Sequence, residues 1–324
     1  FLVFLMRNTL IVSSPSHLHA GNIDLNGSMG RLYGTLGFAL EKPRFTIKVK
    51  AIKNKSIEES TDKEILSYLN LYRDYMGCNK EFFIEIISDI PKHVGLGRTT
   101  AMSLSIGFAL NILCKTHLDV TELAEIANRG NRNSALGLYS FKYGGFIVDG
   151  GVKSNKVAPI IFRGLIDEKY KLLIAIPEKP IKDIVRLKEK EEAILSSMPK
   201  MDDNFAAYLS RLVLMKILPS FAEGDFYTFG KGLTEFNSSL GKYWSKYQGG
   251  IYCCDETSKI IEEMKKLNSL CACQSSWGPT AYGIFLYKDI EKAYHRIEEI
   301  LRHIGGGRAW ISKVDNNGAY ARFV

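Results

Sequence analysis

The 324-residue sequence lacks several features that identify common functional classes. It has six cysteines but no C-x-x-C pair, which argues against a zinc knuckle and a dense disulfide framework. Its basic residues form no tract interleaved with aromatic side chains, so we predict no nucleic-acid partner. No apolar run approaches the length of about eighteen residues that a membrane span needs, so we predict no membrane partner.

We also predict no targeting segment. The first residues, FLVFLMRNTLIV, are apolar but are interrupted by Arg7 and Asn8, which leaves too short a run for a membrane span or a signal-peptide core. We interpret them as a short leader, with Met6 as the start of the natural chain, that runs into a first strand. Together with the scattered cysteines, this predicts a cytoplasmic protein.

The composition describes a globular protein with two domains. Hydrophobic residues make up 46% of the chain and charged residues 24%, and the length exceeds that of a usual single core. A connector rich in Lys, Asn and Pro lies at about 152–168, so we predict one domain over 1–158 and a second over 159–324. The balance of 43 Lys and Arg against 35 Asp and Glu gives a net charge of +8, which suits an acidic small molecule.

Strand and helix patterns segregate along the chain instead of alternating strictly. Alternating runs predict strands, and apolar residues at helical spacing predict helices. The expected strands are 9–14, 35–40, 44–52, 81–88, 146–151, 171–177 and 308–314, and the expected helices are 61–76, 98–114, 120–129, 202–222, 257–267 and 288–302. Residues 15–34 are expected to form a long functional loop. This arrangement favours an α+β fold.

The segment IPKHVGLGRTTA, residues 90–101, places two glycines just before an apolar helix. Glycines allow close approach of the backbone, and the unpaired N–H groups of a helix start favour an anion. The segment is no Walker motif, because no lysine follows Gly97, and no Rossmann fingerprint, because position 100 is not glycine. The candidate phosphate-binding residues are His93, Gly95, Leu96, Gly97, Arg98, Thr99 and Thr100. A simple turn ahead of a core helix is the alternative.

The pattern P-x-x-x-G-L-G-x-[ST]-[ST]-A in this loop resembles the second motif of the GHMP kinase superfamily, with Arg98 where those kinases usually have serine. The kinases carry a catalytic aspartate downstream, in a segment like S-G-I-D ahead of Tyr-Gly-Gly. Residues 134–137, Ser-Ala-Leu-Gly, stand over that segment, so Gly137 takes the aspartate position. The group that orients or deprotonates the acceptor hydroxyl is then missing, and no ATP is expected as a cofactor.

Three longer stretches resemble a non-kinase branch of this superfamily, the beta-ribofuranosylaminobenzene 5'-phosphate synthase family. They cover residues 14–43, 128–151 and 274–283, and the run QSSWGP in the last is the most specific. The resemblance implies a two-domain GHMP kinase-like fold, with an S5 domain 2-like N-terminal domain and a ferredoxin-like C-terminal domain. It also implies a site in the cleft between the domains, and a homodimer.

The activity of that family implies a reaction. Phosphoribosyl pyrophosphate (PRPP) loses pyrophosphate, and an aromatic acid, 4-aminobenzoate or 4-hydroxybenzoate, bonds to the sugar C1 through the ring carbon that bears its carboxylate. Carbon dioxide leaves. In the family this decarboxylating synthesis of a C-glycoside belongs to tetrahydromethanopterin biosynthesis. PRPP and an aromatic or heterocyclic acid are therefore the expected partners.

Charged residues suit this reaction. Arg98 would add charge and a fork of donors to the glycine loop, and Arg31 is a candidate to clamp a carboxylate or the ribose phosphate. Departing pyrophosphate needs cations, so Mg²⁺ is the expected cofactor, with Asp24 and Asp149 as candidate ligands. Asp149 is also a candidate catalytic residue. Either aspartate could instead stabilise a turn.

His17 and His19 flank Leu18, so in an extended chain both point the same way. Either is a candidate catalytic base for the acceptor's hydroxyl or amino proton, or a phosphate ligand, and a pair that only caps a loop is the alternative. Trp277 could stack on an aromatic acceptor, unless it only packs. The candidate acceptor-binding residues are Asn26, Gln274, Ser275, Ser276, Trp277 and Thr280.

The sequence also departs from the family pattern in its binding loops. Tyr33 and Thr35 stand where an aspartate and a glycine are expected, and Cys273 stands where a glycine commonly precedes the glutamine. These changes bear on substrate choice more than on fold. Three alternatives stay open: a related C-nucleoside synthase that uses a heterocyclic acid, a non-catalytic small-molecule binder, and a small-molecule kinase that positions its acceptor by another group.

Overall fold

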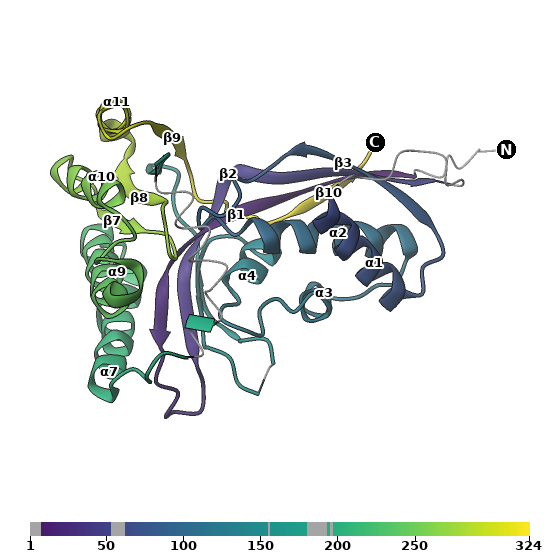
Figure 1. Ribbon diagram of the computed structural model, residues 1–324, viewed down its shortest axis with the longest axis horizontal. Coiled ribbons are helices and arrows are strands. Elements are labelled where there is room, and N and C mark those ends of the chain that lie inside the picture. The colour runs from purple at the N-terminus through teal and green to yellow at the C-terminus, as the bar shows by residue number, and fades with distance from the viewer. Residues whose placement is uncertain (1–7, 53–61, 155, 180–192, 195–196) are drawn as a thin grey trace.

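The computed structural model describes residues 8–52, 62–154, 156–179, 193–194 and 197–324. Its first sheet contains β1 (Thr9–Asp24), β2 (Tyr33–Ile52), β3 (Glu81–Ser88), β4 (Phe146–Asp149), β5 (Ile160–Gly164) and β10 (Tyr320–Phe323). The strand order is β10-β1-β2-β4-β5, with β3 paired to β2, and every pairing is antiparallel. The long strands β1 and β2 run the length of this domain and reach the second one (Figure 1). The leader assigned to the first residues lies outside the described part.

Four helices cover one face of the first sheet (Figure 1). They are α1 (Lys63–Met76), α2 (Arg98–Cys114), α3 (Val120–Ile126) and α4 (Leu136–Lys142). Asp62 caps α1, and Asp119 with Glu122 forms a capping box at α3. Helix α2 is buried on nearly all sides because it packs against β1, β2, α1 and α4. Its first turn is thereby fixed at the end of the sheet that faces the second domain.

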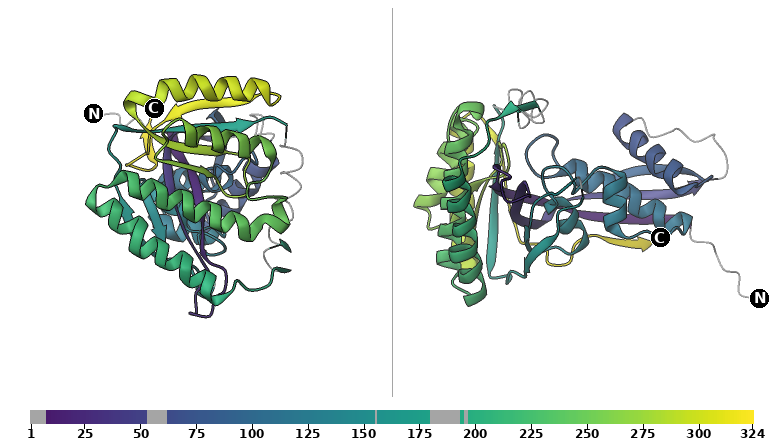
Figure 2. Two further views of the ribbon diagram at one scale, coloured as in Figure 1. Left: turned by 90° about the vertical axis from the view of Figure 1, so that its left-hand side faces the viewer. Right: turned by 90° about the horizontal axis from the view of Figure 1, so that it is seen from below.

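The second domain is built on a four-stranded antiparallel sheet of order β7-β8-β6-β9. Its elements are β6 (Tyr170–Pro177), α9 (Phe226–Gln248), α10 (Asp255–Lys266), β7 (Cys271–Gln274), β8 (Ala281–Leu286), α11 (Tyr287–His303) and β9 (Gly307–Ser312). The order of strands and crossing helices is that of a ferredoxin-like domain, so the predicted two-domain α+β architecture is confirmed. The helices of this domain form a wall at one end of the molecule (Figure 2, right).

The chain crosses between the domains more often than a single boundary allows. Strand β5 follows position 158 but pairs with β4, and β10 returns at the C-terminus to pair with β1. The predicted second domain therefore gives two strands to the first sheet. Both strands are short, and their pairing partners lie far away in the sequence, so local pattern alone could not assign them.

The predicted long loop over 15–34 is wrong for its first half. Residues up to Asp24 continue β1 and pair with β2, and the two strands expected on either side of Pro43 are one strand with register shifts in its pairing. Polar residues on this part of β1 are mostly half-buried, because α9 and β7 of the second domain pack against it. Polarity therefore marks the interdomain cleft here, not a solvent-exposed loop.

The apolar segment predicted to be helical at 202–222 forms α7 (Asp203–Leu212), a π-helical turn over Val213–Ile217, and α8 (Leu218–Glu223). Asp203–Glu223 has the length and the mean hydropathy, 1.3, of a membrane-spanning helix. One such helix among the described residues is weak support for a membrane span, since a helix in a protein core passes the same test. Leu209 and Ile217 of this segment pack into the hydrophobic core. A third of its most apolar window is buried.

Cys78 and Cys114 form a disulfide that joins the ends of α1 and α2. The sequence spacing did not predict it. A single disulfide among the described cysteines does not form a dense disulfide framework, as expected. Disulfides are nevertheless rare in reducing compartments. The cytoplasmic location, which rested partly on cysteine usage, stays a prediction.

Candidate functional site

Two adjoining cavities lie where β1, the glycine loop and the second domain meet. One cavity, of about 260 Å³, lies between β1 and α9, and the other, of about 300 Å³, lies along residues 91–100. His17, His19, Thr100 and Ser276 line both cavities. These four residues therefore stand at the border between two compartments of one cleft.

The glycine loop is held in place through its carbonyl groups. The Ser275 hydroxyl donates to the Gly95 carbonyl at 2.6 Å, the Thr280 hydroxyl donates to the Val94 carbonyl at 2.5 Å, and the His17 amide donates to the Leu96 carbonyl at 3.1 Å. Gly97, the N-cap of α2, has no side chain that could accept from the first-turn amides. The loop thus keeps its carbonyls occupied and leaves the start of a 17-residue helix open to an anion.

The His17 ring fills a space between two glycines. A Cβ atom at Gly97 would lie 1.9 Å from His17 Cε1, and one at Gly137 would lie 2.9 Å from the same atom and 2.8 Å from Thr100 Cγ2. No larger side chain fits at either position without moving the ring. A glycine at position 137, which the sequence pattern matched to the kinase aspartate, leaves this space to a histidine from β1.

The two histidines are neutral. The protein atoms around the ring desolvate its charged form, which lowers the pKa of His17 to about 3, with the nearby His19 lowering it further. Burial likewise lowers the pKa of His19 to about 4. Leu18 between them is fully buried in the core, which turns both rings toward the cleft as predicted. Within the described part of the chain, His19 Nδ1 is buried without a hydrogen-bond partner.

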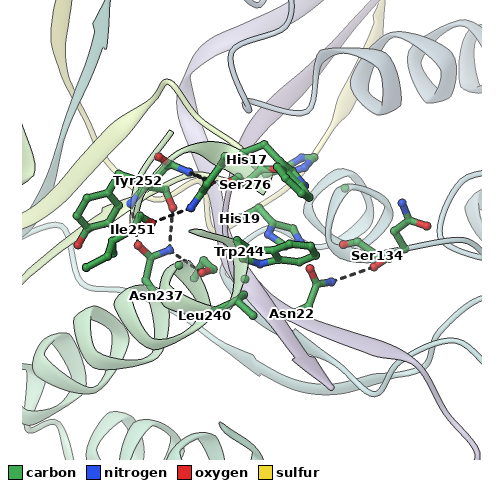
Figure 3. Close-up of a pocket in the computed structure, with 18 of the residues that line it drawn as sticks. His17, His19, Asn22, Ser134, Asn237, Leu240, Trp244, Ile251, Tyr252 and Ser276 are labelled. Carbon is green, nitrogen blue, oxygen red and sulfur yellow. Dashed lines mark hydrogen bonds between the residues drawn. The ribbon is translucent and has the colours of Figure 1, made fainter. Parts of the chain in front are cut away.

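Aromatic rings line the opposite side of the cleft. Trp244 from α9 and Trp277 have ring centroids 4.5 Å apart, and both line the cavity together with Tyr252. Figure 3 shows Trp244, Asn237 and Leu240 of α9 across from His17, His19 and Asn22 of β1. An apolar wall opposite two neutral imidazoles suits a flat, aromatic ligand.

The candidate acceptor-binding residues have different roles in the structure. Ser276 and Trp277 line the aromatic cavity. Gln274 lines it too, but its side chain bonds the Cys253 amide at 2.7 Å and the Ser276 carbonyl at 3.0 Å, so it supports the wall. The hydroxyls of Ser275 and Thr280 hold the glycine loop, as described above. Asn26 donates to the Met201 carbonyl and does not line the cleft, so its assignment as an acceptor ligand is wrong.

The two candidate arginines do not present free guanidinium groups to the cleft. Arg98 lines the loop cavity, but it donates from Nε and Nη2 to both carboxylate oxygens of Asp89, and from Nη1 to Glu64, all at 2.8–3.0 Å. Its side chain is 5% exposed. Arg31 donates to the Gly151 carbonyl and lines a separate apolar groove. Arg98 therefore anchors the loop to its own domain, and the exposed His93 is the candidate that stays at the loop surface.

The two candidate metal ligands do not fit a resident ion. Asp149 is fully buried, and its carboxylate accepts from the amides of Thr35, Ala135 and Gly151 and from the Thr35 hydroxyl. Asp24 accepts from two successive amides in a turn. Among the described residues, no three His, Cys, Asp or Glu side chains form a group that could hold a metal. Both aspartates stabilise backbone, and Thr35, a departure from the family pattern, supports Asp149.

Several lining residues were not predicted from the sequence. They are Asn22, Asn133, Ser134, Asn237, Leu240, Trp244, Gln248, Ile251 and Tyr252. The sequence contains a signal for Leu240 and Trp244, because they belong to a row of apolar residues at helical spacing that marks the buried face of α9. The other members of the row are Phe229, Leu233 and Phe236. The sequence does not say which element that face would meet.

Comparison with known proteins agrees with this geometry. The family model "GHMP kinases N terminal domain" matches residues 63–145, and "GHMP kinases C terminal" matches residues 217–303. The solved homoserine kinase from Cytophaga hutchinsonii superposes with a TM-score of 0.71 at 15% identity, over 99% of this chain and all of that one. This likeness shows the fold alone.

Sequence relatives narrow the assignment. The beta-ribofuranosylphenol 5'-phosphate synthase of Methanocaldococcus jannaschii is 30% identical over 95% of this chain and 99% of its own length. The enzyme of that name from Archaeoglobus fulgidus is 32% identical over 85% of this chain and 87% of its own. With the fold, the cleft and these relatives in agreement, the chain belongs to the beta-ribofuranosylphenol 5'-phosphate synthase family of the GHMP kinase superfamily.

Proposed function

We propose that the protein transfers the phosphoribosyl group of PRPP to an aromatic acid, 4-hydroxybenzoate or 4-aminobenzoate, as a step toward tetrahydromethanopterin. The bond between C1 and pyrophosphate breaks, and pyrophosphate leaves with the electron pair. The ring carbon that bears the carboxylate bonds to C1, and carbon dioxide leaves as the ring regains its aromaticity. The observation that carries this proposal is the neutral His17 in the space beside Gly137, where a kinase of this superfamily would have its aspartate.

The two compartments divide the substrates between them. The loop cavity offers main-chain amides and the start of α2 to pyrophosphate, and the aromatic cavity offers Trp244 and Trp277 to the acceptor ring. The sugar C1 would lie between them, beside the histidines that line both cavities. This arrangement brings the two reacting carbons together, which is the main requirement for a reaction between two bound substrates.

His19 is the better placed of the two bases. Its Nδ1 has no protein partner among the described residues, and its lowered pKa keeps the imidazole neutral at pH 7, so one ring nitrogen can accept a proton. Accepting the hydroxyl or amino proton of the acceptor would increase electron density at the opposite ring carbon as that carbon attacks. His17 packs between the glycines and would orient the loop against the sugar.

Departing pyrophosphate carries negative charge that the site must neutralise. Arg98 is committed to Asp89 and Glu64, so the helix start must supply most of the attraction for pyrophosphate. Mg²⁺ stays part of the proposal only as an ion that would arrive with PRPP, because the two aspartates considered for it stabilise backbone instead.

One assay tests the reaction. Purified protein is given PRPP and Mg²⁺ with 4-hydroxybenzoate, 4-aminobenzoate and a panel of heterocyclic acids, and pyrophosphate and carbon dioxide are both measured. Release of the two in equal amounts with one aromatic acid supports the proposal. Release of both products only with a heterocyclic acid would show that the protein is a C-nucleoside synthase instead. ATP turnover without PRPP would show a kinase, and binding without turnover would show a non-catalytic binder.

A further inference from the structure

Two adjacent cysteines lie behind the aromatic wall of the cleft. The sulfur atoms of Cys253 and Cys254 are 3.3 Å apart. Cys254 is in an extended conformation, in which neighbouring side chains normally point to opposite sides. The close approach of the two sulfur atoms is therefore unusual for adjacent residues. Both cysteines are partly exposed, whereas Cys271 and Cys273 are buried. The pair is therefore an accessible dithiol.

The surroundings give the two thiols different reactivity. Cys254 is the N-cap of α10, a helix of 12 residues, and its sulfur lies 3.1 Å from the Thr257 hydroxyl. A helix start stabilises negative charge. The hydrogen bond from Cys253 is the largest contribution that lowers the pKa of Cys254, which reaches about 7 although burial opposes the shift. Cys254 is therefore the candidate nucleophile of the pair, and Cys253, 3.3 Å away, is the candidate partner that resolves it.

We propose that Cys253 and Cys254 form a reversible modification site that a small disulfide oxidises to a vicinal disulfide. The Cys254 thiolate attacks one sulfur of the small disulfide, whose S–S bond breaks and releases one thiol. Cys253 then loses its proton and attacks the Cys254 sulfur, which releases the second thiol. Two electrons pass from the protein to the small disulfide, and two small thiols are formed.

The bond would be easy to reduce again. Adjacent Cα atoms are about 3.8 Å apart across a trans peptide, which is shorter than the usual Cα separation of a disulfide. Strained, exposed disulfides of this kind have the more oxidising potentials that are found in regulatory bonds. The site would therefore respond to the ratio of small disulfide to thiol and would not lock the protein permanently.

The dithiol is joined to the wall of the acceptor cavity. The Cys253 amide donates to the Gln274 side chain, and that side chain in turn donates to the Ser276 carbonyl. The Cys253 sulfur lies 2.5 Å from where a Cβ of Gly278 would be, so it packs directly on the turn that follows Trp277. The preceding residues Ile251 and Tyr252 line the cavity. Closure of the ring would shift this wall, and this consequence rests on the proposed function.

The modification itself is tested without any assay of activity. The full-length reduced protein is titrated with oxidised glutathione, and intact mass and peptide mapping locate the product. We expect a loss of two hydrogens mapped to Cys253–Cys254, full reversal by reduced glutathione, and one bound phenylarsine oxide per chain before oxidation. Serine is a preferred N-cap residue, so Cys254→Ser should fold and should lose both reactions, whereas a Cys271→Ser control should keep them.

Two results would overturn the proposal. One is a glutathione adduct on Cys254 that persists without the internal bond, and the other is equal arsenical binding by wild type and Cys254→Ser. If the internal bond forms but no aromatic acid reacts under any condition, the proposed function fails while the modification site stands. If both hold, oxidation should raise the KM for the acceptor several-fold and leave the KM for PRPP nearly unchanged.

Discussion

The two sides of the cleft use different chemistry. On the loop side, the groups that face the cavity are mainly main-chain amides at the start of α2, and the nearby arginine is turned into its own domain. On the α9 side, the cavity is lined by aromatic rings, and side-chain amides hold the wall from behind. Under the proposed function, the loop side would bind the pyrophosphate anion and the α9 side would bind the flat acceptor ring. The histidines stand where the two meet.

The largest expected effect is the loss of the bases at this border. Replacing His19 by alanine removes the open acceptor, and we expect kcat to fall by about 10²- to 10⁴-fold with little change in the KM for PRPP. The exposed His295 on α11 is the matched control, and His295→Ala should leave kcat unchanged. Equal kcat values in wild type and His19→Ala would remove this residue from the mechanism.

The same lowered pKa values set the pH dependence. Since both histidines are neutral above about pH 4, kcat/KM should stay level from pH 8 to pH 5 and fall only below that. The unfolded chain binds protons near pH 6.5, so the histidines reduce the free energy of unfolding as the pH falls from 6.5 toward 3. His17→Asn should flatten that slope in denaturant titrations, and an unchanged slope would contradict the desolvated ring.

The second effect concerns the packing of the loop on His17. Gly97→Ala would place a Cβ 1.9 Å from the ring at a φ of 73°, a conformation that costs a non-glycine residue about 1–3 kcal/mol. We expect kcat/KM for PRPP to fall by about 100-fold as the loop is displaced. Gly77→Ala, at a φ of 58° with open space around it, is the matched control for backbone strain alone. Similar losses in both variants would contradict the packing argument.

The third effect separates anchoring from anion binding at Arg98. Because its donors are held by Asp89 and Glu64, Arg98→Ala should lower the free energy of unfolding by about 1.5–3 kcal/mol. The KM for PRPP should rise only in proportion to the loss of loop order. Arg296→Ala, which breaks surface ion pairs with Glu263 and Glu299, should have a much smaller effect on stability. A large loss of PRPP affinity at unchanged stability would restore Arg98 as a direct ligand.

The smallest effect lies on the aromatic side. Trp277→Phe keeps a ring in the wall but reduces its stacking area, so the KM for the acceptor should rise by about 2- to 10-fold while the KM for PRPP stays the same. Isothermal titration of the acceptor into wild type and Trp277→Phe measures the loss of acceptor binding directly. A change in the KM for PRPP of the same size would show that the two compartments are not separate.

Much of the fold could be predicted because its signals are local. The helix Lys63–Met76, the strand Glu81–Ser88 and the helix Arg98–Cys114 were all expected near their observed bounds. The strands β5 and β10 could not be predicted as parts of the first sheet, because strand pairing depends on partners that are distant in sequence. The length of β1 was missed because its polar residues face a cleft formed with the second domain, which the local pattern does not contain.

Residue types and their spacing were enough to identify the groups near the cleft: a glycine loop at a helix start, two histidines at alternate positions, and Gly137 where the family pattern predicts an acid. The tertiary structure alone decided how these groups are used. It set His17 between Gly97 and Gly137, turned Arg98 toward Asp89, and joined Ser275 and Thr280 to the loop. The two differ because the interactions involved act over different distances along the chain. Backbone propensities and caps act over a few residues, whereas burial, desolvation and hydrogen-bond partners are fixed only when distant segments pack together.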